Sequence, residues 1–234
     1  MKAMNFADFK KRVNLSNTDI CREIFAGHRD AIRVKKEKTV VRNLERIFDA
    51  TLKISNRKGF QAMSMRDLSK ETELSMGALY AYFSSKEELL EMLQMQRRSI
   101  TWRILSEHLE AIRLPADRLR AAIRIHLYLS EAMQPWFYFA YMETKHLSKK
   151  DQEDAKASEL ATEKIFIDIL EDGVSQGVFR ETDTTLVAGA IKALLQDWYL
   201  KRWKYSKRKI SVDSYAAFVI DTTETYVNAA TRPH

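Results

Sequence analysis

The stretch LSMGALYAYFSSKEELLEML, residues 74–93, decides how the chain folds. It places a glycine and two tyrosines on a short helix that follows Ser75. Ser84 with Glu87, or Ser85 with Glu88, then forms a capping box that begins another helix. A folding core requires only apolar residues at helical spacing. The clustered tyrosines and the lone Lys86 therefore point to a function at the surface.

The residues before this stretch add two more helices. Apolar residues at helical spacing predict a helix of about five turns that starts near Thr39 and closes at Gly59. Ser64 with Asp67 then opens a short helix that runs to about Thr72. Two short helices joined by a three-residue turn and locked by a third are typical of a helix-turn-helix.

The rest of the chain indicates long helices. Six glycines and three prolines in 234 residues are few, which disfavours a β-sandwich or a phosphate-binding loop. We expect an all-α fold, in which a three-helix DNA-binding head with a helix-turn-helix precedes a larger C-terminal helical bundle. The expected helices of the bundle are 117–133, 135–147, 151–175, 183–204 and 211–229.

The distribution of charge and the cysteine content indicate what kind of partner the protein binds and in which compartment it works. The net charge is +7, and residues 1–60 hold fifteen Lys or Arg against seven Asp or Glu. A basic N-terminal segment beside a body of nearly balanced charge suggests that this end of the protein binds a polyanion, and nucleic acid is favoured over a membrane. The alternative is a solvated basic tail. A single cysteine, Cys21, excludes a disulfide framework and fits a reducing cytoplasm. We see neither a membrane span nor a secretory signal.

A helix-turn-helix gives these residues roles. Its second helix lies in the major groove while flanking groups hold phosphates. Gly77 would allow close approach to DNA, and the hydroxyls of Tyr80 and Tyr82 would reach phosphate. Lys86 would add a cation where the free amides of a helix start already favour an anion.

The pattern T-x-L-S-x-G-x-L-Y-x-Y-F-x-S-K-E-E-L, from Thr72 to Leu89, resembles the DNA-binding signature of TetR-type regulators. The resemblance extends from about Val40 to Leu93. It implies an all-helical homodimer whose last two long helices form a four-helix interface. It also implies a body that encloses a small-molecule pocket, and a ligand that spreads the heads away from a palindromic operator. Most such proteins are repressors.

The resemblance also implies which residues touch DNA. Arg66 would reach a base or phosphate, and the other expected contacts are Arg42, Ser75, Met76, Gly77, Ala78, Tyr80, Tyr82 and Lys86. Glu73 stands where the family commonly has a turn glycine. The second helix offers few hydrogen-bonding side chains, so readout would rest on Arg66, thymine methyls and DNA shape. The expected divisions are a basic extension at 1–38, the DNA-binding domain at 39–93, and a ligand-binding and dimerisation domain at 94–230. The extension would be an arm on DNA or an extra helix on the head.

Aromatic residues in the body suggest a pocket, although core and interface packing explains them equally well. Acyl-CoA thioesters, fatty acids or aromatic acids would suit such a lining, and Lys201, Arg202 and Lys204 could meet an anionic head. The expected pocket residues are Leu105, Leu109, Trp136, Phe137, Phe139, Tyr141, His146, Phe166 and Trp198. The expected dimer interface consists of Leu186, Ala190, Leu194, Tyr215, Phe218, Val219, Thr222 and Tyr226.

Signs of catalysis are weak. Glu143 and His146 stand three residues apart, but no H-E-x-x-H motif and no second cluster complete a metal site. We expect no catalytic residues, metal or cofactor. The prediction is a DNA-binding regulator, with two alternatives: a helical regulator or adaptor without a small-molecule ligand, or a helical enzyme that has lost DNA binding.

Overall fold

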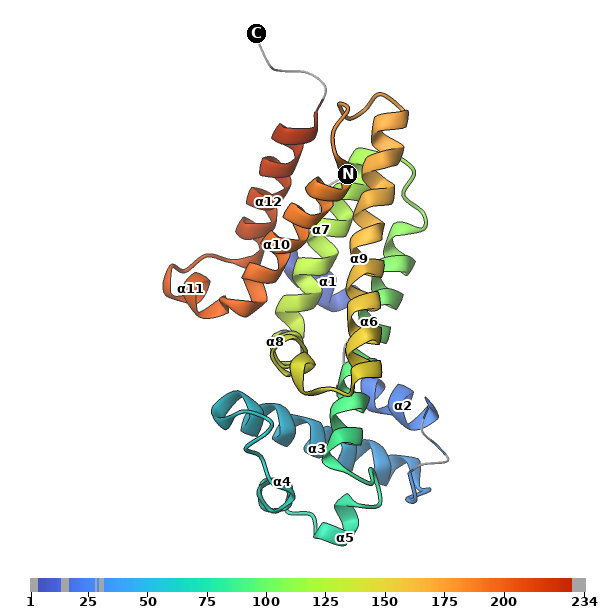
Figure 1. The fold of residues 1–234 in the computed structure, drawn as a ribbon, viewed down its shortest axis with the longest axis vertical. Helices are drawn as coiled ribbons and strands as arrows, with labels where there is room; N and C mark the ends of the chain where they lie inside the picture. Colours follow the sequence, from blue (N-terminus) through green and yellow to red (C-terminus); the bar gives the residue numbers. More distant parts are fainter. Residues whose placement is uncertain (1–3, 14–16, 28, 30–31, 229–234) are drawn as a thin grey trace. The chain divides into compact units, whose positions relative to one another are not determined.

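A computed structural model describes residues 4–13, 17–27, 29 and 32–228. Within these residues the chain is helical, and the one pairing of the β type is an isolated bridge between Phe179 and Asn228. None of the helices described is long and apolar enough to cross a membrane. The α-helices are α1 (Phe6–Arg12), α2 (Asn17–Gly27), α3 (Glu37–Lys58), α4 (Met65–Thr72), α5 (Met76–Leu79), α6 (Lys86–Leu109), α7 (Pro115–Ala132), α8 (Gln134–Glu143), α9 (Lys149–Ser175), α10 (Thr184–Leu200), α11 (Arg202–Lys207) and α12 (Val212–Val227), with a 3₁₀ turn at Thr144–His146 (Figure 1).

The helices form two compact units, each assembled from separate stretches of chain. The head unit contains residues 14–99 and 135–155, and the body unit contains residues 1–13, 100–134 and 156–234. Helices α6 and α9 each contribute to both units. The all-α fold predicted from the sequence is confirmed.

The head unit is built around α3. Its inner face buries Val40, Leu44, Ile47 and Phe48, and Gly59 ends the helix at a φ of 82°. A positive φ favours glycine because a side chain there would be strained. Helix α2 packs on α3 through buried Ile20, Cys21, Ile24 and Phe25. Part of the N-terminal extension is thus an extra helix on the head.

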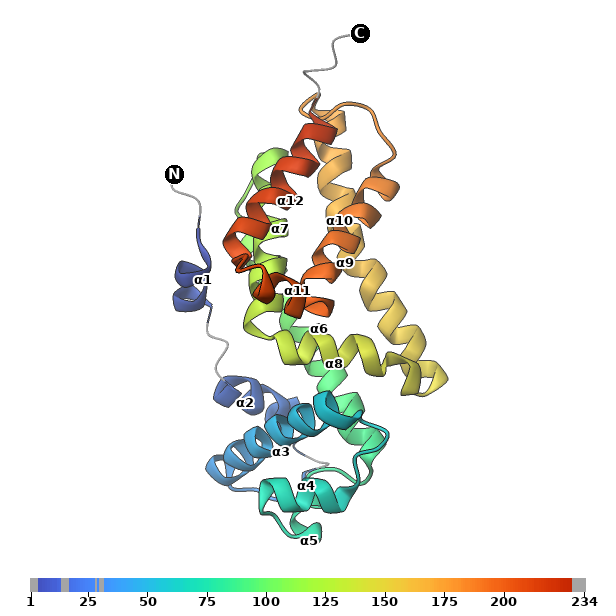
Figure 2. The ribbon, with the colours of Figure 1, turned by 90° about the vertical axis from the view of Figure 1, so that its left-hand side faces the viewer.

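Helix α8 packs against α3 in the same unit (Figure 2). The Trp136 and Phe48 rings meet at a centroid distance of 5.6 Å, and the Phe139 and Phe60 rings meet at the same distance. Both pairs are close to edge-on, an arrangement that aromatic quadrupoles favour. This part of the aromatic run therefore joins the core of the head unit.

The body unit is organised around α7, which packs against α10 and α12. Helix α1 also docks on α7, where fully buried Phe9 touches the rings of Tyr128 and His108. The amide of Phe6 donates to Asp213 Oδ1 at 2.9 Å, and the Tyr128 hydroxyl donates to the same oxygen at 2.6 Å. The beginning of the extension is thus anchored in the body unit.

Candidate nucleic-acid interface

Helix α4 begins with the predicted capping box. The Ser64 hydroxyl accepts from the amide of Asp67 at 3.1 Å, and Asp67 Oδ2 accepts from the amide of Ser64 at 2.8 Å. Lys58 donates to the same carboxylate at 2.7 Å. The hydrogen bonds from Lys58 and Ser64 hold the pKa of Asp67 well below its ordinary value. The start of the helix-turn-helix is fixed at the end of α3.

The turn between α4 and α5 forms without the usual glycine. Glu73 takes the left-handed conformation at φ 53°, and its carboxylate pairs with Arg46 of α3 at 3.0 Å. Ser69 donates to the carbonyl of Leu74 at 2.6 Å, which closes the turn on its other side. The strain of a positive φ in a residue other than glycine is therefore offset by local contacts.

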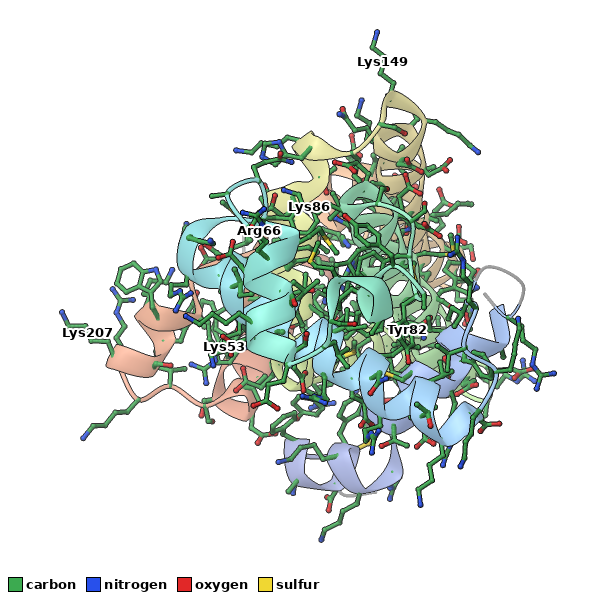
Figure 3. The ribbon with its side chains drawn as sticks, turned by 90° about the horizontal axis from the view of Figure 1, so that it is seen from below. Lys53, Arg66, Tyr82, Lys86, Lys149 and Lys207 are labelled. Carbon is green, nitrogen blue, oxygen red and sulfur yellow. The ribbon has the colours of Figure 1, made fainter. Side chains whose placement is uncertain are left out.

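Helix α5 presents a small and uncharged face. Its N-cap Ser75 accepts from the amide of Ala78 at 3.1 Å. Leu79 is fully buried, whereas Gly77 and Tyr80 are exposed. Among the other predicted DNA contacts, Ser75, Arg66 and Arg42 are exposed, and Met76 and Ala78 are half-buried. These residues stay predictions, and the exposed ones are accessible enough to meet DNA; Figure 3 labels Arg66 among them.

Tyr82 does not fit its predicted role at phosphate. It is 1% exposed, and its hydroxyl accepts from Asn43 Nδ2 of α3 at 2.8 Å. Burial raises the pKa of this hydroxyl. The interpretation of Tyr82 as a DNA contact is corrected because the residue fastens the end of the helix-turn-helix to α3.

Lys86 is also committed inside the protein. Its ammonium donates to the carbonyl oxygens of Phe60 and Gln61 at 3.0 Å and of Met63 at 3.1 Å. Its Nζ lies 4.9 Å from the centre of the Phe60 ring. An ammonium has three donors, and all three are used here. Lys86 therefore holds the loop 59–63 between α3 and α4, and its predicted role as a phosphate contact stays a prediction (Figure 3).

The same loop is held from its other side by α8. Glu143 Oε1 accepts from the amide of Phe60 at 3.3 Å, and Glu143 is 8% exposed. Its Oε2 is buried without a hydrogen-bond partner, 3.8 Å from His146 Nε2. Sequence spacing could not reveal this contact, because Phe60 and Glu143 lie 83 residues apart.

The residues predicted to line a pocket fall into two groups. Those at positions 136–146 belong to the head unit, and the remaining four belong to the body unit. Phe166 and Trp198 are fully buried, as is Leu105, while Tyr141 is half-exposed. The Trp198 ring lies 4.9 Å from that of Tyr205 and 5.0 Å from that of Tyr215, and the two tyrosine rings lie 4.7 Å from each other. Packing thus accounts for much of the aromatic content, and these residues remain only a hypothesis as a ligand lining.

A groove on the body unit offers a different lining. It encloses about 400 Å³, and Leu109 alone comes from the predicted pocket set. Arg118 pairs with Asp172 at 2.8 Å, and its Nε is buried without a hydrogen-bond partner. The groove is lined by Trp102, Ser106, Leu109, Glu110, Ile112, Arg113, Arg118, Ile165 and Asp172.

The basic residues around α11 face internal carboxylates. Asp197 accepts from Lys201 at 2.7 Å and from Lys204 at 2.5 Å. Arg202 makes two hydrogen bonds to Glu131, at 2.7 and 2.9 Å. These contacts hold α11 on the body, and the Lys201 side chain is still 59% exposed, so a meeting of these cations with an anionic ligand stays a prediction.

An apolar face runs along α10 and α12. Leu186 is 71% exposed, Phe218 56% and Tyr226 49%; Ala190 and Thr222 are also exposed, and Leu194 is half-buried. Tyr215 and Val219 instead point into the body, where the Tyr215 hydroxyl donates to the carbonyl of Leu194 at 2.9 Å. These two are therefore removed from the predicted interface. The other six remain predictions.

The part of the chain that the structure describes contains no cluster of three His, Cys, Asp or Glu able to hold a metal ion. Cys21 is buried, and burial together with Glu45 and Asp49 raises the pKa of its thiol. A thiol of this kind is a poor nucleophile.

Two family models of known proteins match separate parts of the sequence. A family model for bacterial regulatory proteins of the tetR family matches residues 47–93, and one for the C-terminal domain of tetracyclin repressor-like proteins matches residues 113–222. The transcriptional regulator HbdR of Aromatoleum sp. strain CIB is 22% identical over 175 residues, which cover 75% of this chain and 76% of HbdR.

Two solved structures have similar folds. PfmR, a TetR family regulator of Thermus thermophilus, has a TM-score of 0.70 and 29% identity, covering 77% of this chain and 98% of PfmR. AibR in complex with isovaleryl coenzyme A and operator DNA has a TM-score of 0.68 and 18% identity, covering 77% of this chain and 97% of AibR. At 18% identity the AibR likeness concerns the fold alone.

Proposed function

The chain belongs to the TetR family of DNA-binding transcriptional regulators, and from this premise we propose that it is a ligand-released repressor that acts as a homodimer on a palindromic operator. The observation that carries the proposal is the accessible face around α5, with Arg66, Ser75 and Gly77 exposed on a head held by buried contacts. A genomic DNA target implies action in the cytoplasm, as a regulator rather than an enzyme.

The proposed base contacts come from α4 and α5. Arg66 is the one guanidinium among the residues of these two helices, and it offers the paired donors that guanine accepts in the major groove. Met76, Gly77 and Ala78 permit close approach and apolar contact with thymine methyl groups. Arg42 and Tyr80, both exposed, would hold phosphates on either side.

The proposed dimer forms through α10 and α12. The exposed side chains here include Leu186, Phe218 and Tyr226. A contiguous exposed apolar patch of this kind marks an interaction site. A second copy would cover this face by a twofold axis, so that two heads could meet two half-sites. Replacing Leu186 and Phe218 together by Asp should give a monomer in analytical ultracentrifugation. Leu114→Asp, at a residue 63% exposed outside α10 and α12, is the matched control.

The proposed effector is an apolar or amphipathic small molecule with an acidic head. Trp102, Leu109 and Ile165 supply apolar walls in the body groove, and Arg113 and Arg118, which also line it, are the cations available to a carboxylate or phosphate. An acyl-CoA, a fatty acid or an aromatic acid meets this description. The coenzyme A thioester bound to AibR supports the first of these as the place to start.

The test begins with selection of bound genomic fragments at moderate salt. We expect enrichment of one palindrome, with affinity that falls steeply as salt rises. Thermal-shift screening of acyl-CoAs, fatty acids and aromatic acids then identifies a ligand, which should release the selected DNA. A ligand that stabilises the protein but leaves it on DNA would refute release. Failure to enrich any sequence would refute operator binding.

A further inference from the structure

The segment between α2 and α3 runs past the end of α5. The amide of Arg33 donates a hydrogen bond of 2.9 Å to the carbonyl oxygen of Ala81, two residues beyond the end of α5. The neighbouring Ile32 is fully buried. A buried anchor and a backbone hydrogen bond together fix this part of the extension beside the recognition helix.

The side chain of Lys35 holds the same segment in place. Lys35 Nζ donates to the carbonyl oxygens of Arg29 at 2.8 Å and of Ile32 at 3.0 Å. Lys36 is the N-cap residue of α3, so the segment continues directly into the main helix of the head. The ammonium of Lys35 is therefore committed to its own turn, and the segment is held at both ends.

The side chain of Arg33 is different. Arg33 is exposed, and among the described residues no carboxylate or hydrogen-bond acceptor pairs with its guanidinium. Helix α5 contributes Met76, Gly77, Ala78 and Leu79, none of which carries a charge. A guanidinium that has no partner among the described residues is thus attached, through a fixed backbone, next to a recognition helix that lacks cations.

We propose that Arg33 contacts DNA beside the site of α5, so that the N-terminal extension supplies the charge that the recognition helix lacks. This inference rests on the proposed binding of duplex DNA by the head. Arginine binds phosphate as a two-pronged donor, and it also enters narrow minor grooves of A·T-rich DNA. Either contact would be made with base pairs flanking those that α5 reads.

Helix α2 lowers the entropy cost of such a contact. Its Thr18 hydroxyl donates to Glu45 of α3 at 2.5 Å, and Gln96 donates to Glu23 at 3.1 Å. With Ile20 and Ile24 buried as well, α2 is itself fixed to the head a few residues before Arg33. A tethered cation loses less entropy on binding than a free tail does.

The test measures binding of Arg33→Ala to the selected operator over a range of salt concentrations. The control is Arg22→Ala, which removes the same charge from α2, where Arg22 already pairs with Asp19 at 2.7 Å and lies 3.7 Å from Glu37. We expect Arg33→Ala to lose roughly ten- to a hundredfold in affinity, the size of one charged hydrogen bond. The magnitude of the salt slope should fall by about 0.9. Arg22→Ala should change neither.

Exchanging flanking A·T pairs for G·C pairs separates the two forms of contact. If the exchange lowers the DNA affinity of wild type but not that of Arg33→Ala, the result supports insertion of Arg33 in the minor groove. If the exchange changes the affinity of both proteins equally, the result supports a phosphate contact. If Arg33→Ala binds as wild type does, with the same slope, the inference is overturned while operator binding stands. If wild type binds no operator, the proposed function itself has failed. Circular dichroism of both variants checks that the head remains folded.

Discussion

Replacing Lys86 by Met tests whether this residue holds the head together or holds DNA. Methionine retains much of the aliphatic length but cannot donate to the carbonyl oxygens of Phe60, Gln61 and Met63. It also removes the charge over the Phe60 ring. The variant therefore removes all the polar contacts of the side chain and few of its apolar ones.

The expected cost follows from the three contacts. A hydrogen bond from a charged donor contributes about 1.5–3 kcal/mol. The contact with Gln61 is exposed, and water can replace it, whereas those with Phe60 and Met63 are partly buried. We therefore expect Lys86→Met to lower the free energy of unfolding by about 2–4 kcal/mol.

Urea unfolding followed by circular dichroism measures this loss. Lys53→Met is the matched control, because Lys53 is 70% exposed and pairs with Glu71 at 2.5 Å. An exposed pair contributes less than about 1 kcal/mol. The stability of the control should therefore stay close to that of wild type.

DNA binding distinguishes the two roles. If Lys86 only positions the loop 59–63, operator affinity falls but the salt slope stays as in wild type. A phosphate contact would instead reduce the magnitude of the slope by about 0.9. An unchanged urea midpoint together with the smaller slope would refute our reasoning and return Lys86 to the DNA interface.

Other contacts give predictions of the same kind. Tyr82→Phe should cost about 1–3 kcal/mol by leaving the buried amide of Asn43 without its acceptor, with no change in the salt slope of operator binding. Glu143→Ala should destabilise the head by about 1–3 kcal/mol in urea unfolding, whereas Glu143→Gln should cost less because it keeps an acceptor for the amide of Phe60. Burial opposes ionisation of Asp197, but hydrogen bonds from Lys201, Lys204 and Tyr205 lower its pKa to about 2. The ionised carboxylate should contribute about 1–2 kcal/mol to folding stability after solvent screening. This contribution should be present above pH 4 and lost as the pH falls toward 2. In thermal unfolding, the difference between Asp197→Asn and wild type should therefore be larger at pH 6 than at pH 2.

The helix-turn-helix was predictable because its signals are local. Ser64 with Asp67 does form a capping box, Ser75 does cap α5, and Ser85 accepts from the amide of Glu88 at the start of α6. Each signal depends on residues three positions apart, which helix geometry places together whatever the rest of the chain does.

The roles of Tyr82 and Lys86 were not predictable in this way. Asn43 lies 39 residues before Tyr82, and the carbonyls that bind Lys86 lie 23 to 26 residues before it. No pattern near either residue indicates these partners. The position of Arg33 also depends on a distant partner, because Ala81 lies far along the chain.

The packing of the aromatic run against the head was hidden in the sequence for a related reason. Consecutive aromatics on a helix face several directions, and the sequence alone could not tell which of them meet α3. Trp136 and Phe139 meet Phe48 and Phe60, which the chain reaches more than seventy residues earlier. In the sequence, the run looked like part of the body.

The contribution of α8 to the head unit limits how this regulator can be recombined with others. A chimaera joined near residue 94 would pair a foreign head with Trp136 and Phe139, whose partners Phe48 and Phe60 would be missing. It would also leave the carboxylate of Glu143 without the amide it accepts from. A transplantable head must carry residues 135–155 along with residues 14–99. Exchanging the whole head unit of this protein therefore requires two separate stretches of chain to be replaced together.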